Sequence, residues 1–209
     1  MINRSPARVP RLRPEQLTDE QRRLYEELLN GPRGQGPQYF ELTDADGVLT
    51  GPFNAMLASP RVGTVLQRLG VALRYHTDLP DQISELVILV VAAYLGSDFE
   101  WYAHESLARH HGVDDDAITA LCEGRPPTLA DPAQGAAYGL AVALLRGEDI
   151  PDERYYAMVR ALGTSGVFDV SAIVGYYWLL AAQLRLFRVG LQAPVAGPHH
   201  PAPQGSRTS

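Results

Sequence analysis

Apolar residues recur at intervals of three and four along most of this 209-residue chain, which is the repeat of one face of an α-helix. The repeat is strongest from Pro52 onward, where the segment "SELVILVVAAYLG" is apolar nearly all round. Few segments combine β-branched residues with a period of two, the pattern typical of a half-buried strand. The hydrophobic pattern therefore predicts an all-α protein.

Capping and stop residues set the expected bounds of the helices. The first covers residues 17–29, where Thr18 is the N-cap and Gln21 completes a capping box. A loop rich in Gly, Pro and Asp follows at 30–50, and a break at Ser59 and Pro60 separates a short helix from one that ends near Tyr75. Further helices are expected at 80–95, 97–111, 114–123, 133–145, 152–162 and 169–187.

The same pattern divides the chain into three parts. Residues 1–16 form a Pro- and Arg-rich N-terminal arm, residues 17–190 a single all-helical domain, and residues 191–209 a tail of Pro, Gly, Ser and His. The tail has no apolar pattern to bury, so we expect it to be disordered. Its two histidines, His199 and His200, are expected to be inert rather than a metal site.

Composition and charge exclude several classes of partner. The formal net charge is -6 and the pI is about 5.5, so we expect no nucleic-acid partner. The longest apolar run, from Leu86, is shorter than the roughly 20 residues of a membrane span. The basic N-terminus lacks the apolar block of a secretory signal. We expect a cytoplasmic protein with no membrane partner.

Two residue types are informative by their scarcity. The chain contains no lysine, so all 18 basic residues are arginine, and an internal lysine Schiff base is excluded. Its single cysteine, Cys122, cannot form an intrachain disulfide or a two-cysteine redox centre. Catalysis in this protein must therefore use other groups.

The stretch "SDFEWYAHESLARHHG" at 97–112 places ionisable groups on one helical face: Ser97, Glu100, His104 and His111. A Glu four residues before a His can hold the imidazole and bias its tautomer, which makes a general acid/base pair. Glu85 adds a carboxylate within the preceding apolar helix, where it needs a partner. The alternative to a catalytic pair is an ordinary Glu/His pair on a solvent-exposed face, without a function.

Two further uses of these side chains stay open. A metal site would use Glu100, His104 and His111, although the spacing differs from the two-histidine H-E-x-x-H motif. Ser97 as a nucleophile would need a closer base than His104, and N-cap of the helix is its simpler role.

The region from Pro52 to Phe187 resembles the carboxymuconolactone decarboxylase family, which includes the alkyl hydroperoxidase D branch. The most specific part is a frame of eight positions: Glu85, Leu86, Gly96, His104, Ala108, Gly112, Val113 and Ile118. The resemblance implies an all-helical bundle that forms homo-oligomers, commonly trimers or hexamers. The hydroperoxidase branch has C-x-x-C before the histidine, and this chain has Ser97 and Glu100 at those positions, which argues against thiol peroxidase chemistry.

By this resemblance, the chain is predicted to be a cofactor-independent lyase or isomerase acting on a small carboxylated or lactone substrate. His104 would donate the proton, Glu100 would orient it, and Glu85 would fix the helix pair or shuttle the proton. The expected substrate-binding residues are Ser97, Trp101, Tyr75, His76 and Tyr177, and the arginines available for the substrate anion are Arg61, Arg68 and Arg74.

Two other functions remain as alternatives to the lyase. A peroxide-linked oxidoreductase could borrow thiols from a partner protein, and a non-catalytic oligomeric scaffold could keep the fold without the chemistry. The lyase is the leading interpretation because the Glu/His stripe is bordered by Trp101 and follows an apolar helix, so the site is expected to be partly desolvated.

Overall fold

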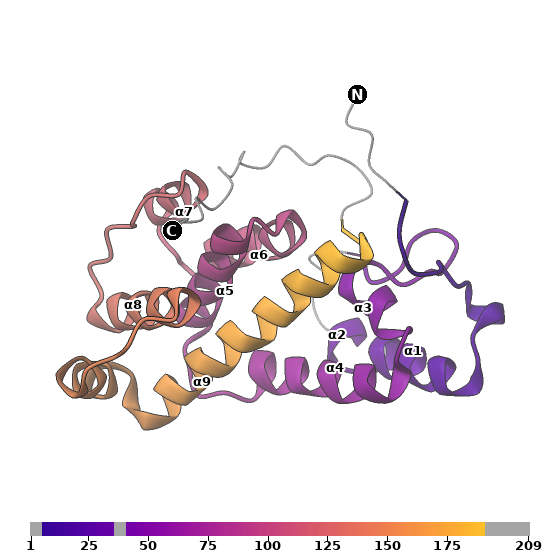
Figure 1. Ribbon diagram of the computed structural model, residues 1–209, viewed down its shortest axis with the longest axis horizontal. Helices are drawn as coiled ribbons and strands as arrows, with labels where there is room; N and C mark the ends of the chain where they lie inside the picture. The colour runs from indigo at the N-terminus through magenta and orange to yellow at the C-terminus, as the bar shows by residue number, and fades with distance from the viewer. Residues whose placement is uncertain (1–5, 36–40, 191–209) are drawn as a thin grey trace, which may run out of the picture. The chain divides into compact units, whose positions relative to one another are not determined.

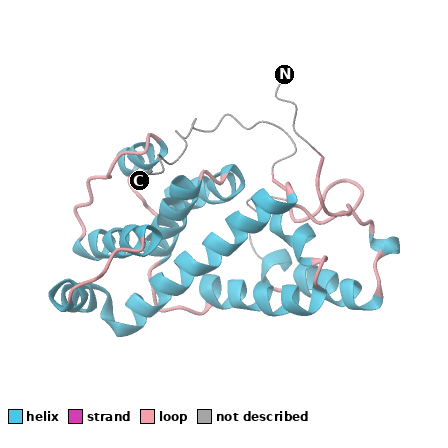
Figure 2. Ribbon diagram, viewed as in Figure 1, coloured by secondary structure: helices cyan, strands magenta, loops and turns pink. Residues whose placement is uncertain are grey.

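The computed structural model describes residues 6–35 and 41–190, and within these ranges it is built from helices (Figure 2). The single β-type contact there is an isolated bridge between Thr43 and Leu49. The all-α prediction is therefore confirmed for the described part of the chain. The predicted disorder of 191–209 lies outside the described residues, as do His199 and His200.

The described residues form two compact units, one from the residues up to His76 together with those from Leu179, and the other from Thr77–Trp178. The first unit contains η1 (Pro14–Gln16), α1 (Asp19–Asn30), α2 (Pro32–Gln35), α3 (Gly51–Met56) and α4 (Pro60–Tyr75). The second contains α5 (Asp81–Leu95), α6 (Asp98–His110), α7 (Asp115–Cys122) and α8 (Pro132–Arg146), and α9 (Asp152–Phe187) has residues in both (Figure 1). A single domain over 17–190 stays a prediction.

In the first unit, α1 packs against α4 through a small apolar core. Leu24 and Leu28 of α1 are completely buried. Gly63 allows α4 to lie close to both α3 and α1, because a Cβ at this position would lie 2.7 Å from the carbonyl oxygen of Met56 and 3.0 Å from Cδ2 of Leu24. The predicted capping box is confirmed, since the backbone N–H of Gln21 donates to Thr18 and the Gln21 side chain accepts from the Thr18 backbone. Two short elements were missed: η1 lies in the predicted arm 1–16, and the short helix α2 lies in the predicted loop 30–50.

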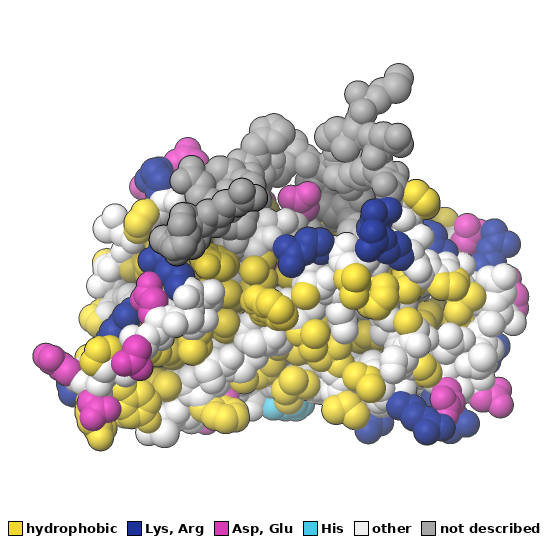
Figure 3. Space-filling model, viewed as in Figure 1, with side chains coloured by type: hydrophobic (Ala, Val, Ile, Leu, Met, Phe, Trp, Pro, Cys, Tyr) yellow, Lys and Arg dark blue, Asp and Glu magenta, His cyan; other side chains and the backbone are white. Residues whose placement is uncertain are grey.

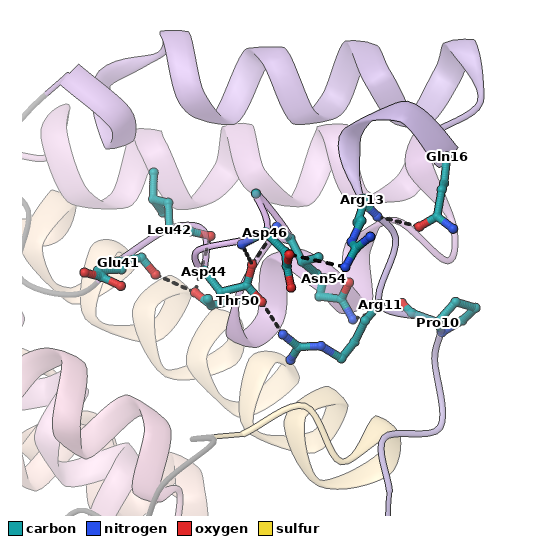
Figure 4. Close-up of polar contacts among 12 residues, drawn as sticks. Pro10, Arg11, Arg13, Gln16, Glu41, Leu42, Asp44, Asp46, Thr50 and Asn54 are labelled. Atoms are coloured by element: carbon teal, nitrogen blue, oxygen red, sulfur yellow. Dashed lines mark hydrogen bonds and ion pairs between the residues drawn. The ribbon is translucent and has the colours of Figure 1, made fainter.

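The N-terminal arm is fastened to this unit by polar contacts (Figure 4). Arg11 forms an ion pair with Asp44, and Arg13 forms one with Asp46 at 3.3 Å. The Asn54 amide donates to the carbonyl oxygen of Pro10 at 3.3 Å. Asp44 also accepts the backbone N–H groups of Asp46 and Val48, so the arm holds a turn that this carboxylate already organises.

The second unit is organised around α5, whose side chains are buried from Ile83 to Ala92 with a single interruption at Ser84. Helices α6, α7 and α8 all pack against it. Gly96 ends α5 in the left-handed conformation, with φ 62°, as its place after the apolar run predicts. The chain then enters α6 with Ser97 at the N-cap position.

The prediction of two helices at 152–162 and 169–187 is confirmed, except that the second begins earlier. The span α9 consists of two helical segments that meet at Gly163, whose backbone is non-helical, with φ 74° and ψ 165°. Residues 164–168 are helical, so one glycine replaces the predicted linker. Among the described residues, α9 alone is long and apolar enough to cross a membrane, a weak criterion that core helices also meet.

Candidate active site

The turn at Gly96 brings together two side chains that are far apart in the sequence. Glu85 lies on α5 before the turn, His104 lies on α6 after it, and the two helices pack against each other. The backbone N–H of Ser97 donates to Ala92 at 2.9 Å, and that of Trp101 donates to Ser97 at 3.0 Å, so the connection is tight. This helix hairpin fixes the geometry of the candidate site.

Both ring nitrogens of His104 face carboxylates. Nδ1 lies 2.7 Å from Oε2 of Glu85, and Nε2 lies 3.7 Å from Oε2 of Glu100. All three residues are deeply buried, with exposed fractions of 3%, 5% and 3% for His104, Glu85 and Glu100. Buried ionisable groups are costly unless they are paired, so this cluster is a strong candidate for a functional site.

The two carboxylates differ in their relation to the imidazole. The distance to Glu85 is that of a hydrogen bond, whereas the distance to Glu100 is too long for one. The sequence predicts Glu100 as the orienting partner, on the basis of its four-residue spacing from His104. The residue that makes the short contact is Glu85, which is nineteen positions away in the chain. Helical spacing relates residues within one helix, so the sequence of α6 alone could not identify a partner on α5.

An aromatic side chain from α9 completes the surroundings of His104. The rings of Tyr177 and His104 meet edge to face, with centroids 5.2 Å apart and an interplanar angle of 89°. Tyr176 in turn packs edge to face on Tyr177 at 5.2 Å, and both tyrosines are buried. Edge-to-face aromatic pairs of this kind favour one ring orientation. Tyr177 was predicted to bind substrate, and the structure brings it against the catalytic candidate itself.

Ser97 and Trp101 lie on the same helix as His104. Ser97 occupies the N-cap position and is buried, but its side chain makes no capping hydrogen bond. The indole N–H of Trp101 donates to Glu105 at 3.0 Å, and Glu105 also accepts from Arg109 at 2.7 Å. Trp101 is thus tied to a neighbouring polar network, and its predicted role in substrate binding stays a prediction.

The other predicted site residues lie elsewhere in the fold. Tyr75 and His76 are exposed at the end of α4, in the first unit, and their role stays a prediction. His111 follows α6 and faces Asp81 at 3.5 Å. Within the described ranges, no group of three or more His, Cys, Asp or Glu side chains is arranged to hold a metal ion.

The arginines suggested for the substrate anion belong to the first unit. Arg61 donates to Glu20, and Arg68 donates to Glu27, on the exposed sides of α1 and α4. The guanidinium of Arg74 stacks over the ring of Tyr75 at 5.7 Å. In the second unit, the buried polar side chains are Glu85, Ser97, Glu100 and His104, a set without a buried arginine.

Cys122 lies on α7, whereas the Glu85, Glu100 and His104 cluster lies on α5 and α6. It is partly buried, and burial, followed by the charges of Glu105 and Glu123, raises the pKa of its thiol above the ordinary value of 9.0. A thiol with a raised pKa is mostly protonated near neutral pH and is a poor nucleophile. Cys122 therefore fits a structural role.

These observations define a helical protein with a buried carboxylate–imidazole–carboxylate cluster and without a cysteine pair. Residues 60–143 match the Carboxymuconolactone decarboxylase family, as the eight-position frame indicated. This match and the AhpD-like solved structures support the carboxymuconolactone decarboxylase and AhpD-like superfamily, and the single cysteine of the chain is consistent with a branch that lacks the cysteine pair. The search of curated proteins found no match.

Solved structures establish the fold independently of close sequence similarity. An uncharacterised peroxidase-related protein with an alkylhydroperoxidase AhpD core, from Ralstonia eutropha JMP134, is similar with a TM-score of 0.68 and 14% identity over 92% of this chain and 94% of that one. A protein of unknown function from Agrobacterium tumefaciens is similar with a TM-score of 0.58 and 19% identity, over 68% and 97% of the two chains. At these identities, the likeness shows the fold alone.

A third relative in structure is the debrominase Bmp8. A cysteine-to-alanine variant of that enzyme, in complex with 2,3,4-tribromopyrrole, is similar with a TM-score of 0.63 and 13% identity over 90% of this chain and 93% of that one. The same fold thus carries more than one chemistry, so the function of this chain must be argued from its own site.

Proposed function

We propose that this protein is an enzyme that transfers protons with the Glu85–His104 pair, as a cofactor-independent lyase or isomerase. The observation that carries the proposal is the 2.7 Å contact between buried His104 Nδ1 and buried Glu85, with Glu100 on the opposite side of the ring. An imidazole held by one carboxylate, with its second nitrogen directed elsewhere, is the arrangement of a general acid/base.

The hydrogen bond to Glu85 sets the tautomer of the imidazole. When the ring is neutral, Nδ1–H donates to the Glu85 carboxylate, and Nε2 carries the lone pair that accepts a proton from the substrate. When the ring is an imidazolium, Nε2–H is the donor that returns a proton. Glu85 is therefore proposed as the orienting residue, and Glu100 as the carboxylate that balances the charge on the Nε2 side.

Decarboxylation is the reaction that we propose within this class. The bond between the substrate carbon and its carboxylate breaks, CO₂ leaves, and the electron pair delocalises into the unsaturated lactone as a dienolate. His104 Nε2–H then protonates the carbon, and solvent reprotonates the ring. Loss of CO₂ leaves the negative charge on the dienolate, and the proton from His104 neutralises it.

Thiol chemistry has less support from the same region. Ser97 and Glu100 stand where the hydroperoxidase branch has cysteines, and Cys122 is on another helix with a raised thiol pKa. The peroxide-linked alternative would therefore need thiols from another protein.

The direct test is turnover of γ-carboxymuconolactone in D₂O by the wild type and by His104→Gln and Glu85→Gln. We expect wild-type product with one deuterium at the carbon of the dienolate that His104 protonates. His104→Gln should lower kcat by about 10²- to 10⁴-fold, the usual contribution of a general acid. The matched control is Glu105→Gln, a carboxylate on the same helix that bonds Trp101 and Arg109 instead of His104.

Circular dichroism of each variant separates lost chemistry from lost folding. Turnover that survives His104→Gln with the fold intact would contradict the assignment of the acid. A wild type that binds this lactone without converting it would support the scaffold alternative. Turnover that requires added thiol and peroxide would support the oxidoreductase alternative.

A further inference from the structure

The turn at residues 42–50 is a small hairpin that its own contacts hold together. The backbone N–H of Asp44 donates to the carbonyl oxygen of Val48 at 3.0 Å. One carboxylate oxygen of Asp44 accepts the backbone N–H groups of Asp46 and Val48, both at 2.9 Å. Its apolar side chains are buried: Leu42, Val48 and Leu49. None of these contacts involves the N-terminal arm, so the hairpin is a preformed surface on which the arm lies.

The arm crosses this hairpin with two arginines in register with two aspartates. Arg11 pairs with the second carboxylate oxygen of Asp44, and Arg13 pairs with Asp46 at 3.3 Å (Figure 4). Arg13 is in extended backbone, with φ -70° and ψ 158°. Two residues spaced by two in the arm thus meet two residues spaced by two in the hairpin. This is the register of an extended peptide that a second segment recognises through alternate side chains.

The backbone of the arm is bound as well. The side-chain amide of Asn54 donates to the carbonyl oxygen of Pro10 at 3.3 Å, and the backbone N–H of Arg8 donates to Phe187 at 2.8 Å. Asn54 is only 4% exposed, and its side-chain oxygen is buried without a hydrogen-bond partner within the described ranges. A buried amide with an unused oxygen is costly to retain, which favours a role in binding peptide backbone.

The ion pairs of the arm lie at the surface, where salt can weaken them. The side chains of Arg11 and Asp44 are 42% and 25% exposed, and those of Arg13 and Asp46 are 55% and 63% exposed. Basic and acidic side chains lie next to each other where the arm runs (compare Figures 1 and 3). Exposed ion pairs contribute little and are screened by salt. The arm can therefore leave while the hairpin stays folded.

We propose that the hairpin 42–50 and Asn54 form a binding site for an extended peptide with two arginines in an Arg-x-Arg spacing, and that the arm is its resident ligand. When the arm is released, the site takes such a segment from another protein. Asp44 and Asp46 bind its two guanidinium groups, and Asn54 binds the carbonyl group before the first arginine. The site belongs to the first unit and is independent of the chemistry proposed for His104.

The first experiment measures release of the arm by fluorescence anisotropy of a dye on Ala7→Cys, in the full chain with Cys122→Ser. Ala7 is exposed, so the dye leaves the contacts of the arm in place. We expect the anisotropy to fall as NaCl rises from about 50 mM to about 1 M. Asp44→Asn combined with Asp46→Asn should lower it already at low salt, because asparagine keeps an acceptor oxygen but loses the charge.

The matched control is Glu26→Gln, which removes an exposed carboxylate on α1 and should leave the anisotropy at the wild-type value. Circular dichroism of each variant verifies that folding is retained. An anisotropy that is the same in wild type and in the double aspartate variant would overturn the proposal.

A synthetic peptide of residues 6–16 then tests the site in trans. A tethered arm competes at an effective concentration on the order of millimolar, so we expect millimolar peptide to lower the anisotropy to that of the double variant. The same peptide with Arg11→Gln and Arg13→Gln should have at least about tenfold less effect, since it lacks the charge-assisted pairs. Equal displacement by both peptides, or no displacement by the arginine peptide up to about 10 mM, would overturn the proposal.

Discussion

At the scale of single residues, the imidazole of His104 is restrained from three directions. Glu85 holds Nδ1 at 2.7 Å, Glu100 lies on the Nε2 side at 3.7 Å, and the ring of Tyr177 packs against it edge to face. A proton carrier gains from such restraint, because proton transfer requires the nitrogen to keep one position relative to the substrate. We therefore propose Tyr177 as a positioning residue for His104.

Tyr177→Leu should lower the free energy of unfolding by roughly 2–4 kcal/mol, since it removes a buried ring, whereas Tyr177→Phe keeps the ring. The discriminating measurement is the NMR spectrum of His104. We expect the imidazole resonances to shift in Tyr177→Leu, which loses the ring current, and to stay close to wild type in Tyr177→Phe. If the imidazole resonances of His104 were unchanged in Tyr177→Leu, the positioning role of Tyr177 would be contradicted.

At the scale of elements, the α5–α6 hairpin depends on one backbone conformation. Gly96 has φ 62°, and a Cβ added there would meet no atom within 4 Å, so substitution is opposed by backbone strain alone. Gly135 in α8 likewise has open space around it but lies in ordinary helical backbone. These two glycines separate conformational strain from steric fit.

Gly96→Ala should lower the free energy of unfolding by about 1–2 kcal/mol through left-handed strain. Gly135→Ala should raise it by about 0.5–1 kcal/mol, because alanine loses less conformational entropy in a helix. Urea denaturation of the two variants beside wild type measures both effects. The same sign for both substitutions would show that backbone conformation does not determine the outcome.

The contact between α1 and α4 contains a carboxylate whose ionisation is linked to folding. The hydrogen bond from Arg68 lowers the pKa of Glu27 below its ordinary value of 4.5, and Gln67 adds a second hydrogen bond. Because the folded-state pKa is lowered, this stabilisation is present above the unfolded pKa. It is lost as the pH falls through the folded pKa.

Glu27→Gln should therefore be less stable than wild type at neutral pH, and the difference should shrink below about pH 4.5. Thermal unfolding over a pH series checks this. Glu26→Gln, an exposed neighbour on the same helix, is the control and should follow wild type throughout. A difference that grows on acidification would contradict the linkage.

At the scale of the whole molecule, the N-terminal arm connects segments from distant parts of the sequence. Arg8 donates its backbone N–H to Phe187 at 2.8 Å and its side chain to Leu186 at 3.2 Å, so it satisfies carbonyl groups at the end of α9. Further along, the arm contacts Asn54 and the turn at Asp44. The arm thus acts as a strap made of several weak contacts.

Removing residues 1–13 should lower the stability of the first unit by about 1–3 kcal/mol, because hydrogen bonds to α9 and α3 are lost together. Arg11→Ala alone should cost less than about 1 kcal/mol, since exposed ion pairs contribute little. Urea denaturation of both proteins gives the comparison. If the truncation and Arg11→Ala lowered the stability equally, the Arg11–Asp44 ion pair would account for the whole effect of the arm.

The local features of the fold could be predicted from sequence, since they depend on neighbouring residues. Thr18 with Gln21, Pro60, and Gly96 each end or begin a helix through the backbone conformation and hydrogen bonds of a single turn. The interruption between the two segments of α9 was predicted as well, and the structure narrows it to Gly163, whose backbone angles are non-helical.

The sequence by itself determined that this protein is helical, which residue types are available to it, and that thiol-pair and lysine chemistry are excluded. It also singled out His104 and Glu85. Only the tertiary structure decided which carboxylate holds the imidazole and which aromatic ring packs on it. The physical reason is that helical periodicity relates residues within one helix, whereas the partners of His104 come from α5 and α9. Their distances depend on how helices pack, which no single stretch of sequence specifies.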